Sequence, residues 1–68
     1  MGDIKKEIGI KIRTFREQRG LTQEKLGAIA DMHRAYIGHI ERGEKNITID
    51  NLQRIAKALR VGIKDLIP

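Results

Sequence analysis

The sequence predicts an all-α domain made of five short helices. Apolar residues recur at spacings of three and four along most of the chain, which is the period of an amphipathic helix. Glycines and threonines stand at the ends of these segments, where a helix stops in a left-handed residue or begins at a capping hydroxyl. No segment shows the alternation of apolar and polar residues that is typical of a strand. We expect one domain with helices at residues 4–19, 23–30, 34–42, 49–60 and 63–67.

Each predicted helix has one apolar face and recognisable ends. Thr22 and Thr48 are expected to cap the second and fourth helices, and Gly20 and Gly43 to end the first and third. A last short helical turn is expected before Pro68. The residues expected to face the core are Ile4, Ile8, Ile12, Phe15, Leu26, Ile29, Ala30, Ile37, Ile40, Ile49, Leu52, Ile55, Ala56 and Leu59.

Length, charge and composition limit the classes of function. A chain of 68 residues buries only about 60% of its unfolded surface, and without cysteine it has no disulfides or thiolate metal sites. Fourteen lysines and arginines against nine aspartates and glutamates give a net charge of +5. This charge suits a polyanionic partner, but it also serves ordinary solubility. No apolar run approaches the roughly 20 residues of a membrane span, and the N-terminus lacks the pattern of a secretory signal. We therefore expect a soluble, cytoplasmic protein.

Residues 23–42 have the spacing that a helix-turn-helix requires. Two helices that cross steeply over a short turn tolerate only a small side chain at the crossing point, and Gly27 stands there. Apolar residues occur in register on both sides of the turn, at Leu26, Met32, Ile37 and Ile40. The residues between them are polar or small. This register predicts a helix-turn-helix whose second helix begins near residue 34.

Five segments make the chain similar to a known family of regulators. The pieces are Ile12-Arg-Thr-Phe-Arg16, Gly20-Leu-Thr-Gln-Glu-Lys-Leu26, Arg34-Ala-Tyr-Ile37, Ile40-Glu-Arg-Gly43 and Leu52-Gln-Arg-Ile-Ala-Lys-Ala-Leu59. Over about residues 8–67 the chain resembles Cro/repressor-type (XRE) helix-turn-helix regulators, and residues 33–47 especially resemble the controller proteins of restriction–modification systems. The resemblance implies a five-helix, lambda-repressor-like fold and a transcriptional regulator that binds double-stranded DNA.

Two positions depart from the family's pattern. Asp31 stands at a turn position where the family often has glycine, and aspartate tolerates the left-handed conformation better than most residues do. Arg60 stands where a helix-ending glycine is common. We expect the cap of the fourth helix to shift to Gly62.

Three residues on the second helix of the motif are the candidate base readers. Arg34 lies at its start and can bond guanine O6 and N7 bidentately, although it is otherwise an ordinary surface arginine. Ala35 can touch a thymine methyl group or can simply favour the helix. His39 lies one turn further on, where the resemblance places a third base-reading position; a solvated histidine is the alternative.

A second set of residues is expected to contact phosphates and fix the register on DNA. Thr22 and Gln23 begin the first helix of the motif, where the resemblance assigns Gln23 to a phosphate and to bracing Arg34. His33 either caps the following helix or contacts the DNA backbone. Tyr36 either donates its hydroxyl to a phosphate or belongs partly to the core. The full set is Thr22, Gln23, His33, Tyr36, Arg42, Lys45 and Asn46.

The remaining candidate residues concern structure and assembly. The resemblance implies a salt bridge between Arg16 and Glu41. It also implies a homodimer that reads two half-sites of a pseudo-palindromic operator. We expect Ile63, Leu66 and Ile67 to supply the dimer interface; their alternative role is to close the last helix onto the core. RNA polymerase is a further expected partner, and no cofactor or metal is expected.

The sequence supports two other classes of function less well. An enzyme is not expected, because the sequence has only two histidines, no cysteine and no glycine-rich phosphate loop. A protein-interaction module is the stronger alternative, in which the same fold serves as an antitoxin or adaptor and DNA binding is secondary.

Overall fold

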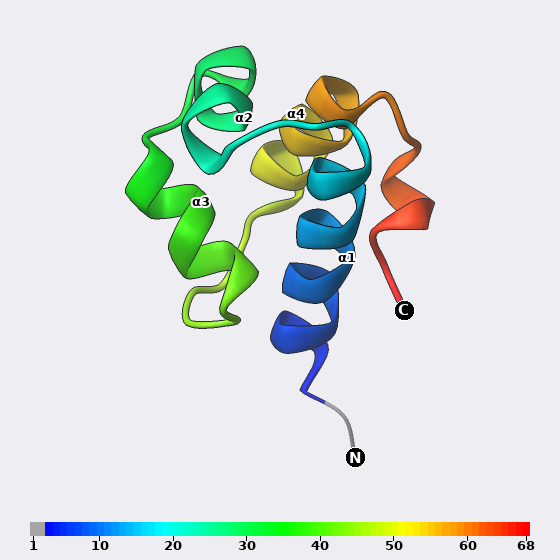
Figure 1. Ribbon diagram of the computed structural model, residues 1–68. Helices are drawn as coiled ribbons and strands as arrows, with labels where there is room; N and C mark the ends of the chain where they lie inside the picture. Colours follow the sequence, from blue (N-terminus) through cyan, green and yellow to red (C-terminus); the bar gives the residue numbers. More distant parts are fainter. Residues whose placement is uncertain (1–2) are drawn as a thin grey trace.

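The computed structural model describes residues 3–68, which form four α-helices and one turn of 3-10 helix (Figure 1). The helices are α1 (Ile4–Gln18), α2 (Gln23–Ala30), α3 (Arg34–Glu41) and α4 (Ile49–Leu59), followed by η1 (Ile63–Asp65). No strand occurs within residues 3–68, so the all-α class is confirmed. In Figure 1, α2 and α3 lie on one side of α1, and the C-terminal segment lies on the other.

The prediction of five α-helices was wrong at the C-terminus. The backbone amides of Asp65 and Leu66 donate to the carbonyls three residues earlier, which is the 3-10 pattern. The segment is therefore a single turn that brings Leu66 against the core.

The helices begin and end largely where capping chemistry predicts. Thr22 and Thr48 accept hydrogen bonds from amides of the first turns of α2 and α4, and Asp3 does the same for α1. Arg60 itself adopts the left-handed conformation, with φ 61°, and its amide donates to the carbonyl of Lys57. The expected shift of this cap to Gly62 was therefore wrong. Gly62 has φ −79° and begins η1 instead.

The core is aliphatic and is formed by the four α-helices and by Leu66, which follows η1. Its fully or nearly fully buried members are Ile8, Ile12, Leu26, Ala30, Ile37, Ile40, Leu52, Ile55, Ala56, Leu59 and Leu66. Three residues that were expected to face inward are exposed instead: Ile4, Ile29 and Ile49. Ile4 and Ile49 are the first residues of α1 and α4. The buried stripe of α2 is narrow and consists of Leu26, Gly27 and Ala30, which leaves Ile29 at its edge.

Two glycines allow neighbouring helices to approach α3 and the turn before it closely. A Cβ atom on Gly27 would collide with the carbonyl oxygen of Met32, so the tight helix-turn-helix crossing requires glycine there. A Cβ atom on Gly9 would lie 2.5 Å from the carbonyl oxygens of both Ile40 and Glu41. Gly9 therefore lets α1 pack directly on the C-terminal backbone of α3.

Arg54 of α4 holds the end of α2 in place. Its Nη2 atom donates to the carbonyl oxygens of Ala30 and Asp31, at 2.8 Å each. These carbonyls lie at the end of α2 and have no partner within the helix. Asp31 has φ 59°, as the turn requires, and its carboxylate lies 3.7 Å from Arg54. The turn between α2 and α3 is thus fixed from α4.

Within residues 3–68, no helix has both the length and the apolar character needed to cross a membrane.

Candidate nucleic-acid interface

The start of α2, the outer face of α3 and the loop after α3 form one polar surface. Six of the ten residues predicted to contact DNA are exposed there: Thr22, His33, Arg34, Ala35, Lys45 and Asn46. Arg42 is also exposed, whereas Gln23, Tyr36 and His39 are half-buried. The opposite face of α3 is anchored in the core by Ile37 and Ile40. The structure therefore presents the predicted residues on a helix whose inner side is fixed.

Arg34 is held by a carboxylate from the preceding helix. Its Nη1 atom lies 3.0 Å from Oε2 of Glu24, and both side chains remain more than half exposed. A shallow depression beside this pair is lined by Glu24, Ala28, Met32, His33 and Arg34. An exposed pair of this kind contributes at most about 1 kcal/mol, so a stronger acceptor can displace Glu24. Arg34 thus has a defined position and remains available to a ligand.

His33 caps the recognition helix. Its Nδ1 atom accepts a hydrogen bond of 2.9 Å from the backbone amide of Ala35, while its own backbone is extended. This arrangement fixes the tautomer, because Nδ1 must be unprotonated to accept. His33 therefore has the first of its two expected roles, that of the N-cap of α3. His33 is nevertheless an exposed residue.

Side chains at the end of α3 form a small charged cluster. Nδ1 of His39 lies 2.7 Å from Oε1 of Glu44, and Nε of Arg42 donates to Oε2 of the same carboxylate at 3.0 Å. The hydrogen bond from Arg42, followed by that from His39, lowers the pKa of Glu44 below its ordinary value. Glu44 therefore stays ionised and keeps the two basic side chains together at the flank of α3.

Gln23 and Tyr36 point partly inward. Nε2 of Gln23 donates to Oε1 of Glu41 at 3.1 Å, so the expected bracing of Arg34 by Gln23 is not present; Glu24 occupies that role. The ring of Tyr36 packs against the core, and its hydroxyl accepts a hydrogen bond of 3.0 Å from Asn51. Tyr36 therefore belongs partly to the core, which was the second of its two expected roles. Its hydroxyl hydrogen remains available for donation.

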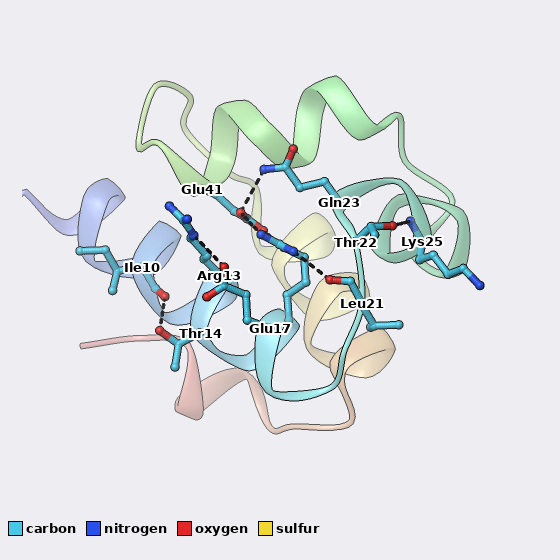
Figure 2. A network of polar contacts seen from close by, with 10 residues as sticks. Ile10, Arg13, Thr14, Glu17, Leu21, Thr22, Gln23, Lys25 and Glu41 are labelled. Atoms are coloured by element: carbon cyan, nitrogen blue, oxygen red, sulfur yellow. Dashed lines mark hydrogen bonds and ion pairs between the residues drawn. The ribbon is translucent and has the colours of Figure 1, made fainter.

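A buried ion pair fastens the recognition helix to α1 (Figure 2). Nε and Nη2 of Arg16 donate to the two carboxylate oxygens of Glu41, at 2.6 and 3.0 Å. Nη1 of Arg16 also donates to the carbonyl of Leu21, at 2.8 Å. The hydrogen bond with Glu41 raises the pKa of Arg16 above its ordinary value. Both residues are at most 9% exposed, so a buried pair joins α1, the start of α2 and the end of α3.

Several residues of this region were not found from the sequence. Glu24 has no signal beyond its place in the first turn of α2, and its contact with Arg34 depends on the crossing angle of two helices. Asn51 and Arg54 are polar residues of α4 that reach Tyr36 and the turn, respectively. A polar residue on an amphipathic helix is ordinarily solvated, so their spacing gave no indication of these contacts.

One of the residues predicted for a dimer interface is not on the surface. Leu66 is completely buried within the protomer, because the single turn of η1 directs it against the core. Its prediction as an interface residue was wrong, and the alternative role of closing the core describes it. Ile67 is 40% exposed, and Ile63 is half-buried against the core.

The fold and this surface define a helix-turn-helix domain with an exposed recognition helix. Residues 12–66 match the helix-turn-helix family HTH_3, and the chain belongs to that family. The family predicted from the sequence motifs is thus confirmed.

The relatives include control proteins. The chain is 44% identical over 66 residues to the control protein C.BamHI of Bacillus amyloliquefaciens, which covers 96% of this chain and 82% of that protein. It is 40% identical to the control protein C.SmaI of Serratia marcescens, over 96% of this chain and 77% of that protein. The fold is similar to the crystal structure of the restriction-modification controller protein C.AhdI from Aeromonas hydrophila. That comparison gives a TM-score of 0.89 and 32% identity, over 91% of this chain and 94% of that one. The predicted resemblance to controller proteins is confirmed.

Proposed function

We propose that this protein is a transcriptional regulator that reads double-stranded DNA with the outer face of α3. The observation that carries this proposal is the presentation of Arg34 and Ala35 on a recognition helix whose other face and C-terminal end are immobilised. Ile37 and Ile40 hold the inner face, and the buried pair of Arg16 with Glu41 holds the end. A base-reading side chain needs such a fixed helix, because a helix that moves cannot keep two hydrogen bonds on one base edge.

The surface divides into base readers and phosphate contacts. Arg34, Ala35 and His39 are the proposed readers. The proposed phosphate contacts surround them at the start of α2 and after α3: Thr22, Gln23, His33, Tyr36, Arg42, Lys45 and Asn46. The backbone amides at the start of α2 add a favourable dipole for a phosphate. We propose no catalytic activity and no cofactor for this protein.

Replacing Arg34 by alanine tests this division. On a duplex obtained by selection from a random pool, we expect Arg34→Ala to weaken binding by about 1–3 kcal/mol while leaving non-specific binding nearly unchanged. Lys45→Ala should weaken binding to every duplex by a similar factor, since a phosphate contact carries no sequence information. Gel-shift titrations with selected and scrambled duplexes measure both effects. Equal behaviour of the two variants would contradict the division.

The salt dependence of the same titration separates a DNA reader from an interaction module. The logarithm of the affinity should fall linearly with the logarithm of the salt concentration, with a slope of about −0.9 for each phosphate neutralised. A flat dependence, or no binding, favours the antitoxin or adaptor alternative.

We also propose that two protomers bind a pseudo-palindromic operator as a homodimer. One domain of this size makes few base contacts, and two half-sites about one helical turn apart double them. Ile67, with the half-buried Ile63, is the proposed centre of the interface.

Charging this patch with Ile67→Asp should shift the sedimentation coefficient towards that of a monomer. Ile10→Asp, at a position 62% exposed on α1, is the matched control and should not. Retention of the dimer by Ile67→Asp would place the interface elsewhere.

The similarity to control proteins supports a role in a restriction–modification system, with activation or repression that depends on protein concentration. RNA polymerase is the proposed further partner when the protein activates, and the cytoplasm, on the nucleoid, is its proposed location.

A further inference from the structure

An exposed isoleucine lies on a face of the molecule that the proposed DNA surface does not use. Ile29 is 58% exposed, and two shallow depressions share Ile29 and Ala58. Glu24 and Ala28 of the same helix line the depression beside Arg34 instead. The name Ile29 groove denotes the surface formed by Arg19, Leu21, Ile29, Lys57, Ala58 and Arg60. It runs across α2 and α4 and contains no residue of α3.

The groove combines an apolar floor with a positively charged rim. Leu21 and Ala58 are half-buried and pack against the core, and Ile29 stands beside them. Asp31 and Arg54 also line the depression that contains Lys57, and their opposite charges offset each other, with 3.7 Å between Nη2 of Arg54 and the carboxylate. Within residues 3–68, no ion pair involves Arg19, Lys57 or Arg60. The rim therefore keeps three uncompensated positive charges around an apolar centre.

Arg60 occupies its place in the rim at a conformational cost. It has φ 61°, a left-handed conformation that glycine adopts without penalty and that other residues adopt unfavourably. A glycine would end α4 equally well, so nothing in the helix cap requires arginine. A residue kept in an unfavourable backbone conformation points to a role for its side chain. Here that side chain lines the depression with Ile29.

We propose that the Ile29 groove docks an acidic segment of a partner protein that carries one apolar side chain. The apolar side chain would cover Ile29 and Leu21, and flanking carboxylates would face Arg19, Lys57 and Arg60. A nucleic-acid backbone matches the charge of the rim but leaves the apolar floor uncovered. A second copy of this chain offers an excess of positive charge to a face that is already positive. An acidic peptide segment satisfies both parts of the groove.

The test uses a designed probe and the intact protein. The probe is a 13-residue peptide with a central leucine flanked on each side by glutamate and alanine residues, titrated into isotopically labelled protein and followed by backbone amide NMR shifts. We expect the largest shifts at Arg19, Ile29, Ala58 and Arg60, with small shifts in α3. A matched peptide with serine in place of leucine should bind about tenfold more weakly, because it removes the apolar contact.

Variants of the protein locate the site. Ile29→Ala should weaken peptide binding about tenfold, whereas Ile49→Ala, at another exposed isoleucine, should leave it unchanged. Arg60→Gly should weaken binding about two- to fivefold, as expected for one exposed ion pair. Its unfolding midpoint should not fall, since glycine relieves the left-handed backbone. Loss of binding without loss of stability separates docking from a structural role.

Three results overturn the proposal. The first is the absence of amide shifts in the groove at millimolar peptide, or equal binding of the leucine and serine peptides. The second is a non-specific DNA duplex that shifts the groove residues as strongly as α3, which would make the groove a further DNA contact. The third is sedimentation of Ile29→Ala as a monomer under conditions where the unaltered protein is a dimer. None of these outcomes depends on whether Arg34 reads DNA bases.

Discussion

Glu41→Ala should destabilise the protein by about 3–5 kcal/mol, a large part of the 5–15 kcal/mol typical of a small domain. The substitution leaves the guanidinium of Arg16 buried without its carboxylate, and it also removes the acceptor of Gln23. An uncompensated buried charge is far more costly than the loss of an exposed ion pair. Urea denaturation, followed by circular dichroism, measures the difference in the free energy of unfolding.

The exposed pair Arg13–Glu17 is the matched control for this prediction. Its Nε and Oε2 atoms lie 3.2 Å apart on α1, but both side chains are more than half exposed. Glu17→Ala should therefore cost less than about 0.5 kcal/mol. The double variant Arg16→Met, Glu41→Leu should recover most of the lost stability, because it removes both charges together. A cost below about 1 kcal/mol for Glu41→Ala would show that water or another carboxylate compensates Arg16.

Gly9→Val should cost about 3 kcal/mol, at the upper end of the range for overpacking. The new side chain would meet the carbonyl groups of Ile40 and Glu41, which are backbone atoms and cannot rotate away. The only relief is to move α1 away from α3, which also stretches the bonds between Arg16 and Glu41. We therefore expect weaker DNA binding as well as a lower unfolding midpoint in a thermal denaturation experiment.

Thr14→Val provides the control on the same helix. It introduces the same side chain at an exposed position, and threonine and valine have similar helix propensities. A change of no more than about 0.5 kcal/mol is expected there. If both variants lost equal stability, the close approach of α1 and α3 at Gly9 would not limit the packing.

The fold was predictable where local chemistry determines it. The threonine caps, the left-handed Gly20 and Gly43, and the small residue at Gly27 all depend on neighbours within a few positions. Predictions failed where the outcome depends on contacts between distant segments. Ile29 and Ile49 belong to apolar periodic patterns, but no other element covers them. Leu66 was misassigned because only the folded chain shows that its single turn reaches the core.

The candidate site divides in the same way. The positions of Arg34 and Ala35 at the start of α3 follow from the spacing of the motif, as does the place of His33 just before the helix; that His33 caps the helix follows only from the structure. The partner of Arg34 does not, since Glu24 lies ten residues earlier and meets it only through the crossing of α2 and α3. In the sequence, Gly9 is simply a glycine that is unfavourable within a helix. Only the folded structure shows that the absence of its side chain lets α1 pack against α3.

The network around Arg16 determines how small a working fragment of this protein can be. Glu41, at the end of the recognition helix, has its main partner 25 residues earlier in the chain, outside the motif itself. A peptide of residues 22–43 would contain both helices of the motif, yet Glu41 would lack that partner and α3 would lack the support of Gly9. Each of its helices has only eight residues, below the roughly 12–15 at which an isolated helix becomes marginally stable. We therefore expect that the motif does not fold on its own. A chimera built to transfer this DNA specificity must include α1 as well.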